Sequence, residues 1–342
     1  MRDRRQDGIV RAPRQAIVRS TWRAILRADN ASRCSLALRL RTLLVTGHTG
    51  FVGRTVSDVV QREPTGWRIA TLPDGFDIRS TELARHVAGT PADAVLHLAA
   101  LTSVAASFRD PETYFDVNFN GTWNLLKALR SASFTGRLLF VSSGDCYGAV
   151  PSDELPIRES APLRPRSPYA VSKVAAESLC YQWAYSGQLD IVLARAFNHI
   201  GPGQDSRFAV ASFARQISRV RAGIAESRIV TGDLDVTRDL TDVRDVVRAY
   251  LALIDSGRTG EVYNVGSGRE IRMADVLREL LSLAGVTAET IVDKSRVRIG
   301  EQRRAVADVR RIRSDAGWTP SIPLSRTLAD MLDEWTQRSR LE

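Results

Sequence analysis

A short apolar run, a glycine-rich turn and a helical pattern follow one another over residues 41–62, and no other feature constrains the fold as strongly. RTLLVT (41–46) is rich in residues that favour strands. The turn GHTGFVG (47–53) leads into apolar residues at helical spacing, from Phe51 to Val60. A strand joined to a helix by such a turn predicts a βα unit.

The same alternation continues toward residue 196. Short strands that alternate with helices predict right-handed crossovers, and hence a parallel sheet with helices on both faces. The fold class expected is therefore α/β. Strands are expected at 68–72, 93–98, 137–142 and 190–195, and helices at 51–62, 80–88, 111–131 and 168–186.

The rhythm changes after residue 196, where the turn-rich FNHIGPGQ begins. We expect 41–196 to form the cofactor-binding domain and 197–340 to form mainly a smaller α/β substrate lobe. Segments near 236–265 are expected to return to the first domain. In this part helices are expected at 206–222, 242–256, 272–285 and 324–338, and strands near 228–231 and 261–265.

Positive charge is concentrated at one end of the chain. The formal net charge is +9, and residues 1–41, with 11 Arg and 3 Asp, supply +8 of it. The other 301 residues carry 37 basic and 36 acidic side chains, which disfavours a body that binds nucleic acid. Composition predicts that residues 1–40 are a basic, disordered extension or precede the true start. A tail that binds a surface or a nucleic acid is the alternative.

Cysteine usage and apolar content bear on the redox compartment of the protein and on whether it crosses a membrane. Cys34, Cys146 and Cys180 lack the paired spacing of a disulfide framework or a zinc site. We therefore expect no metal and a reducing, cytoplasmic environment. No run of 18 apolar residues occurs, so a membrane span is not expected.

The glycine loop has the spacing of a dinucleotide-binding turn. Gly47 allows a tight turn, Gly50 lets the backbone approach a pyrophosphate, and Gly53 lets helix and strand pack closely. The N-terminus of the following helix favours phosphate charge. The loop therefore predicts a nucleotide cofactor in a Rossmann-like, doubly wound sheet. Asp74 is a candidate for meeting the adenosine ribose and Arg54 for meeting a 2′-phosphate, so the choice between NAD and NADP stays open.

The stretch SPYAVSKVAAE (167–177) carries the second signal. Ser167 is a candidate helix cap, and Tyr169 and Lys173 are then four residues apart on one helical face. A free tyrosine has a pKa of roughly 10, which is too high for efficient proton exchange at neutral pH. We expect the lysine cation to lower the pKa of Tyr169 and to hold a nicotinamide ribose.

These motifs together resemble the extended short-chain dehydrogenases/reductases that act on nucleotide sugars. The resemblance covers residues 41 to 338 through GHTGFVG, HLAA (97–100), SSGDCYG (142–148), PYAVSK, TRDLTDVRD (237–245) and YNVGSG (263–268). More narrowly, the chain resembles the GDP-4-keto-6-deoxy-D-mannose reductases, which use NADPH or NADH to make GDP-D-rhamnose. NADP is slightly favoured over NAD, and a homodimer with a GDP-sugar substrate is expected.

The resemblance also implies roles for individual residues. The implied catalytic residues are Ser143, Asp145, Tyr169 and Lys173. The implied cofactor-binding residues are Gly47, Gly50, Phe51, Val52, Gly53, Asp77, Ile78, Leu98, Ala99, Ala100, Tyr169 and Lys173. The implied substrate-binding residues are Thr102, Ser103, Asn198, Arg238, Arg298 and Glu301, and an arginine fork suits a diphosphate. His97 is expected to be a packed strand-end residue.

SSGDCYG bears on which reaction is catalysed. Related dehydratases carry Thr, then Asp or Ser, then Glu at positions that resemble Ser143, Gly144 and Asp145. Gly144 has no side chain and Asp145 is one methylene shorter than Glu, so the stretch favours a reductase. The alternatives are a GDP-mannose 4,6-dehydratase, a nucleotide-sugar 4-epimerase, and a cofactor-sensing protein that catalyses nothing.

Overall fold

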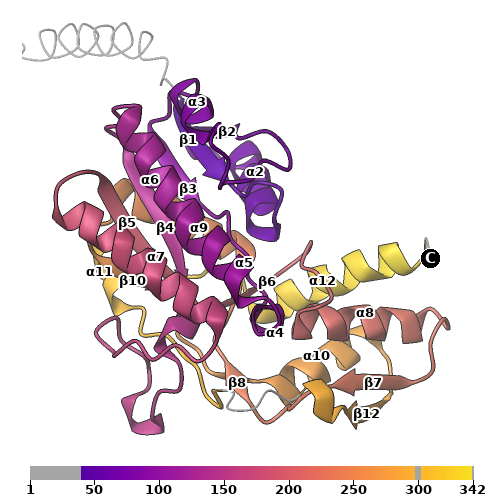
Figure 1. Ribbon diagram of the computed structural model, residues 1–342. Coiled ribbons are helices and arrows are strands. Elements are labelled where there is room, and N and C mark those ends of the chain that lie inside the picture. The colour runs from indigo at the N-terminus through magenta and orange to yellow at the C-terminus, as the bar shows by residue number, and fades with distance from the viewer. Residues whose placement is uncertain (1–39, 297–301, 341–342) are drawn as a thin grey trace, which may run out of the picture. The chain divides into compact units, whose positions relative to one another are not determined.

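The computed structural model describes residues 40–296 and 302–340 (Figure 1). The predicted extension 1–40 falls almost wholly outside the described residues, as do Cys34, Arg298 and Glu301. The Rossmann-like parallel sheet expected from the sequence is present. It has six strands in the order β10-β5-β4-β3-β1-β2, and every neighbouring pair is parallel. These strands are β1 (Arg41–Thr46), β2 (Trp67–Thr71), β3 (Ala94–His97), β4 (Arg137–Ser143), β5 (Asp190–Ala196) and β10 (Val262–Val265).

Alternate side chains of each strand enter two different cores. Leu43 of β1 belongs to the core on one face of the sheet, and Leu44 belongs to the core on the other. Helices α2 (Phe51–Arg62), α9 (Val243–Ser256) and α11 (Arg310–Ala316) cover the first face. Helices α3 (Leu83–Ala88), α6 (Gly121–Ser131) and α7 (Pro168–Tyr185) cover the second (Figure 1).

The helix expected over 111–131 is interrupted. It consists of α5 (Pro111–Phe115), a π-helical turn at 116–120 and α6. Asp110 caps α5 by accepting a hydrogen bond from the backbone of Thr113, and Pro111 occupies the first turn. A π turn inserts one extra residue, and such turns are frequent at functional sites. The helix expected at 80–88 begins only at Leu83, because two hydrogen-bonded turns precede it.

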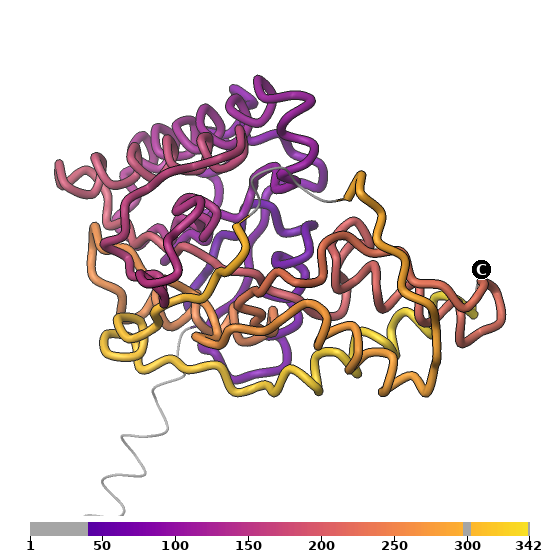
Figure 2. Tube along the Cα trace, turned by 90° about the horizontal axis from the view of Figure 1, so that it is seen from below, coloured from indigo at the N-terminus to yellow at the C-terminus, as the bar shows by residue number. Residues whose placement is uncertain are grey.

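A third core lies in the C-terminal half of the chain. It joins α8 (Ala209–Arg221), α10 (Met273–Ala284) and α12 (Leu324–Ser339). Helix α12 runs beside α8 in both views (Figures 1 and 2). Three short strand pairs complete this part: β6 (Asn198–Ile200) with β9 (Leu240–Asp242), β7 (Arg228–Thr231) with β12 (Glu289–Val292), and β8 (Thr237–Arg238) with β11 (Ile271–Arg272).

The remaining elements are short. They are α4 (Val104–Ser107) and 3₁₀ turns at 144–147, 152–154 and 294–296. Cys146 and Cys180 are free, buried core residues, as expected. Among the described residues, no helix is long and apolar enough to cross a membrane. The same residues contain no group of three or more His, Cys, Asp or Glu placed to hold a metal ion.

Candidate active site

The carboxyl ends of the central strands meet where the order of the sheet reverses. After β1 the chain adds β2 on one side and then returns to add β3 on the other side. Crevices at such switch points are where parallel α/β sheets bind ligands. The glycine loop follows β1, residues 98–100 follow β3, and Ser143 ends β4, so three groups of predicted residues converge there.

The glycine loop is fixed by close backbone packing. Gly47 has a φ of 73°, and a Cβ on it would lie 2.7 Å from the backbone nitrogen of Ala99. A Cβ on Gly53 would lie 2.5 Å from the carbonyl oxygen of Gly47. Gly50 caps α2, and no side chain caps the first turn, which contains Phe51 and Val52. Its backbone N–H groups are therefore available to a pyrophosphate, and the loop fits a dinucleotide.

The residues expected near the adenosine have partners within the protein. His48 Nε2 lies 2.8 Å from Asp74 Oδ1, and Arg54 donates to the carbonyl oxygens of Thr49 and Gly203. Arg79 pairs with Asp77 and lowers the pKa of that carboxyl. Ile78 is buried, and its side chain lies against Gly121, the first residue of α6.

Tyr169 and Lys173 lie in the first turns of α7. Ser167 caps this helix by accepting a hydrogen bond from the backbone of Ala170 at 3.1 Å, as expected. Tyr169 and Ser143 are hydrogen-bonded to one another, and both are buried. The Lys173 side chain is buried too, and its Nζ lies 4.5 Å from the centroid of the Phe140 ring on β4. The structure therefore brings the predicted hydroxyl, phenol and ammonium groups together.

The expected direction of the tyrosine pKa is wrong. Burial raises the pKa of Tyr169, the charge of Asp145 raises it further, and the hydrogen bond with Ser143 lowers it only in part. The lysine does not reverse this effect. Burial also lowers the pKa of Lys173 to about 8. Tyr169 is consequently a protonated phenol at neutral pH, which suits a proton donor.

The stretch 144–147 is a 3₁₀ turn that exposes the Asp145 side chain and buries Gly144. The Asp145 side chain is exposed, while its backbone N–H donates to Ser143 Oγ at 3.2 Å. Gly144 is buried against Phe197, the residue after β5. A Cβ on Gly144 would lie 3.2–3.3 Å from the Phe197 ring, which leaves little room for a side chain.

The predicted substrate residues that the structure describes lie on different segments of the chain. Thr102 is exposed, and Ser103 caps α4 by accepting a hydrogen bond from Ala106 N at 3.2 Å. Asn198 is exposed on β6. Arg238 on β8 donates to the carbonyl oxygens of Thr237 and Gln302, which anchor its guanidinium.

The family model of GDP-mannose 4,6 dehydratase matches residues 74–331. The chain belongs to this family. Its extended short-chain dehydrogenase/reductase architecture agrees with the glycine loop and with the Ser143, Tyr169 and Lys173 cluster.

Within this dehydratase family, one similar protein is a reductase. The chain is 42% identical over 300 residues to GDP-6-deoxy-D-mannose reductase from Pseudomonas aeruginosa, covering 88% of this chain and 99% of that protein. The structure of RMD from Pseudomonas aeruginosa complexed with NADPH matches with a TM-score of 0.82 and 41% identity, over 87% and 99% of the two chains. Thermus thermophilus UDP-glucose 4-epimerase, solved with NAD, matches with a TM-score of 0.75 and 31% identity, over 86% and 98%.

This family member also has a buried polar network that sequence reasoning missed. Thr46 Oγ1 is hydrogen-bonded to His97 Nδ1 at 2.7 Å and accepts from the backbone of Ala99 at 3.2 Å. His97 Nε2 is hydrogen-bonded to Thr122 Oγ1 at 3.0 Å, and Thr122 donates to the carbonyl oxygen of Asn118. His97 is thus a packed strand-end residue, as expected, and burial lowers its pKa to about 3.

Asn118 links this network to the catalytic helix. Its side chain bonds the N–H and the carbonyl oxygen of Leu101, at 2.8 and 3.0 Å, and donates to Ser172 Oγ at 2.9 Å. Ser172 in turn donates to the carbonyl oxygen of Tyr169. The π turn that carries Asn118 therefore fixes the loop after β3 relative to α7. Its local signal in the sequence was an asparagine among helix-forming residues, which is too weak to stand out.

Proposed function

We propose that this protein reduces the C4 keto group of GDP-4-keto-6-deoxy-D-mannose with NADPH to give GDP-D-rhamnose. The observation that carries the proposal is the 42% identity to a GDP-6-deoxy-D-mannose reductase over nearly the whole of both proteins. The similar structure complexed with NADPH, at 41% identity, favours NADPH over NADH. The UDP-glucose 4-epimerase is less similar, at 31% identity.

Tyr169, Ser143 and Lys173 divide the chemistry in this proposal. NADPH, when bound, supplies a hydride to the carbonyl carbon at C4. Tyr169 donates its phenolic proton to the C4 oxygen as negative charge develops there, and its raised pKa keeps that proton available. Ser143, which is hydrogen-bonded to Tyr169, orients the same oxygen. The Lys173 ammonium holds the nicotinamide ribose.

The turn after β4 supports reduction without elimination of water. Elimination needs acid and base groups that reach C5 and C6 of the sugar, and their geometry must be tight. Gly144 provides no such group, and Phe197 occupies the space beside it. Asp145 is the carboxylate that remains at this edge. A dehydratase is the second candidate, because the family model that matches the chain is that of a dehydratase.

We also propose a division of labour along the chain. Residues 41–196 bind the dinucleotide, and residues 197–340 bind mainly the GDP-sugar. Thr102 and Ser103 contact the sugar, while Asn198 and Arg238 contact the diphosphate or ribose. Arg298 and Glu301 are assigned to the same site by resemblance alone. We assign the proposed reaction to the cytoplasm, where NADPH and nucleotide sugars are available.

A homodimer is the assembly we propose. Apolar and aromatic side chains are exposed along α5 to α7, including Tyr181 at 51% and Tyr185 at 83%. A groove of about 800 Å³ lies there, lined by residues that include Phe115, Pro168 and Val171. Exposed apolar patches of this kind mark interaction sites, and a second copy would cover them. Sedimentation of the wild type and of a Tyr181→Glu variant tests this; a monomeric wild type would refute it.

The deciding experiment mixes purified enzyme, NADPH and freshly prepared GDP-4-keto-6-deoxy-D-mannose and follows the near-ultraviolet absorbance of NADPH. Rapid oxidation in the wild type and its loss in Tyr169→Phe, with NADPH binding retained, are expected. The product should be identified as GDP-D-rhamnose by its NMR spectrum. Absence of oxidation, together with formation of a keto sugar from GDP-mannose, would establish the dehydratase instead.

A further inference from the structure

A buried ion pair connects the elements that carry the proposed catalytic residues. Arg195 on β5 contacts Glu177 on α7 through Nε, at 3.1 Å from each carboxylate oxygen, and through Nη2, at 2.5 Å from Oε1. Each of the two side chains is only 6% exposed. The remaining guanidinium nitrogen, Nη1, donates to the hydroxyl of Tyr147 at 2.9 Å and to the carbonyl oxygen of Glu159 at 3.0 Å.

The three residues lie close to the catalytic groups in the chain. Glu177 follows Lys173 by four residues, so the two share one face of α7. Tyr147 ends the 3₁₀ turn that begins after Ser143. In the sheet, Arg195 is paired with Ser142, the residue before Ser143. The Arg195 guanidinium therefore joins the catalytic helix to the end of the turn that follows β4, while the Arg195 backbone is paired with the strand that leads into that turn.

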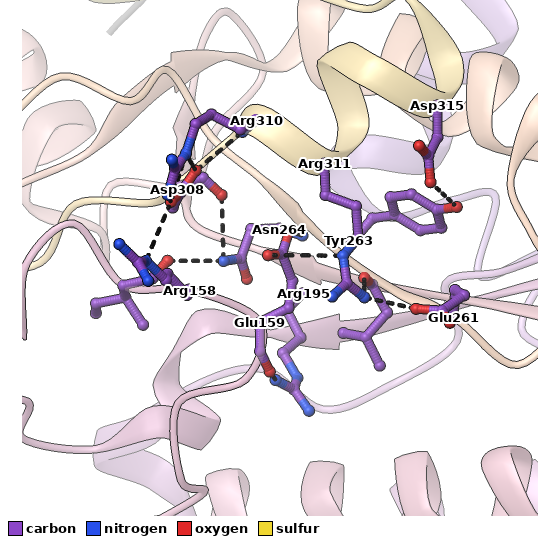
Figure 3. A network of polar contacts seen from close by, with 12 residues as sticks. Arg158, Glu159, Arg195, Glu261, Tyr263, Asn264, Asp308, Arg310, Arg311 and Asp315 are labelled. Atoms are coloured by element: carbon purple, nitrogen blue, oxygen red, sulfur yellow. Dashed lines mark hydrogen bonds and ion pairs between the residues drawn. The ribbon is translucent and has the colours of Figure 1, made fainter.

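A second layer holds this cluster from the far side. The Tyr147 hydroxyl donates to the Asn264 side chain on β10 at 2.6 Å. The Asn264 amide donates to the carbonyl oxygens of Ile157 and Asp308, and its backbone N–H donates to the Glu159 carboxylate at 3.1 Å (Figure 3). The guanidinium and the Asn264 amide therefore have directed partners, which is the condition under which buried polar groups make a structure rigid.

Stability alone does not explain this arrangement. A buried ion pair recovers its desolvation cost only with good geometry, and well-packed apolar residues are often equally stable in its place. Arg137 and Asp190 join β4 to β5 at the opposite ends of the same strands, with side chains 20% and 36% exposed. The deeply buried Arg195–Glu177 pair, which joins the catalytic end of β5 to α7, therefore points to a role in positioning.

The pair also lies beside a lysine whose charge matters. Besides Glu177, the titratable groups that interact with Lys173 are His97 on β3, Cys146 in the turn 144–147 and Cys180 on α7. Burial holds the pKa of His97 at about 3 and raises that of Cys146 to about 11 and that of Cys180 further. Burial likewise raises the pKa of Tyr169. Between pH 6 and 10, Lys173 is therefore the member of this group that changes its charge.

We propose that Arg195 is a positioning residue, which through Glu177 and Tyr147 holds the catalytic helix against the Ser143 turn and balances the carboxylate charge beside Lys173. The inference rests on the proposed reduction for its kinetic test, but its electrostatic part is measured on cofactor binding alone. Because Arg195 and Glu177 carry opposite charges, removing one or the other should shift the pH at which Lys173 loses its proton in opposite directions.

The test measures two pH profiles in the full-length enzyme: kcat/KM for the reduction, and the Kd for NADPH from its fluorescence. At alkaline pH, as Lys173 loses its proton, kcat/KM should fall and the Kd for NADPH should rise. In Arg195→Met the unbalanced Glu177 carboxylate should move this transition to higher pH. In Glu177→Gln the unbalanced Arg195 should move it to lower pH. Each shift should be on the order of one pH unit, and the Arg195→Met/Glu177→Leu double variant should return near the wild-type value.

Positioning is separated from charge by a conservative change. Arg195→Lys keeps the positive charge but loses the planar fork that spans Glu177 and Tyr147. It should restore the wild-type pH transition. Its kcat should still be about tenfold to a hundredfold below that of the wild type, because small misplacements of catalytic groups have effects of that size. KM for the sugar should change much less than kcat.

Arg137→Met is the matched control, since it breaks an arginine–carboxylate pair at the opposite end of β5, away from the catalytic residues. It should leave both pH profiles and kcat unchanged. Circular dichroism and sedimentation of every variant exclude unfolding. Shifts of the same sign in both single variants, or a shift in Arg137→Met, would overturn the proposal. If no variant or wild type reduces the keto sugar, the proposed function fails, while the NADPH profiles still decide the electrostatic part.

Discussion

Replacing Lys173 by methionine should make the protein more stable while it destroys catalysis. Burial lowers the pKa of Lys173 from its ordinary value of 10.5 to about 8. One pKa unit corresponds to about 1.4 kcal/mol, so at pH 7 the buried charge costs the fold about 3 kcal/mol. The contact of Nζ with the Phe140 ring at 4.5 Å returns about 1 to 2 kcal/mol. Lys173→Met should therefore raise the free energy of unfolding by about 1 to 2 kcal/mol.

The gain has a defined pH dependence. Between pH 8 and 10.5 the unfolded chain keeps a proton on Lys173 that the folded chain has lost. The wild type therefore gains stability as the pH rises from about 8 to 10.5 and loses it again as the pH falls through the same window, with no further loss below it. Methionine does not titrate, so the advantage of Lys173→Met should be full at pH 7 and should shrink toward pH 10.5.

Urea unfolding followed by tryptophan fluorescence at pH 7, 9 and 10 measures this difference. Lys127→Met is a suitable control, because Lys127 is exposed on α6 and also contacts an aromatic ring, that of Trp123, at 5.5 Å. It should change the free energy of unfolding by less than about 0.5 kcal/mol at every pH. A Lys173→Met variant that is less stable than the wild type at pH 7, or whose advantage is constant with pH, would refute the reasoning.

Three further substitutions test the site. Gly47→Ala should weaken NADPH binding at least about tenfold, because its Cβ meets Ala99, whereas Gly66→Ala has a similar φ of 74° in open space and should leave binding intact in fluorescence titrations. Asn118→Leu should lower kcat about tenfold to a hundredfold in single-turnover kinetics, and wild-type rates would contradict the positioning role. Gly144→Ser should lower kcat/KM by crowding Phe197, and Phe197→Leu should restore part of it; additive losses would argue against the contact.

Local sequence patterns were enough to predict the bounds of elements with a regular apolar periodicity. The strand at 41–46 and the helix at 51–62 are observed with the predicted bounds, because an apolar run and a helical stripe are written in adjacent residues. The break in 111–131 was missed because a π turn preserves helical composition and changes only the backbone hydrogen bonds. The same property hid Asn118, whose partner Ser172 lies 54 residues away.

Spacing placed Tyr169 and Lys173 on one helical face, and the family resemblance added Ser143, but neither predicted the electrostatics of these residues. A lysine four residues after a tyrosine indicates a lowered pKa when only these two side chains are considered. The fold buries both of them, and desolvation then outweighs the pairwise attraction. Burial depends on β4, α6 and the turn 144–147, which come from distant parts of the chain. The Arg195–Glu177 pair was missed for the same reason.

The position of β10 in the sheet has a consequence for folding during synthesis on the ribosome. This strand pairs with β5, yet a helical and partly irregular segment of the substrate-binding part is synthesised between them. While the ribosome makes that segment, β5 presents an unpaired edge, a state prone to wrong pairing with other chains. Helix α9, which covers one face of the sheet, is also still missing. The nucleotide-binding sheet therefore stays incomplete, with one edge and part of one face uncovered, until residues 243–265 have been made.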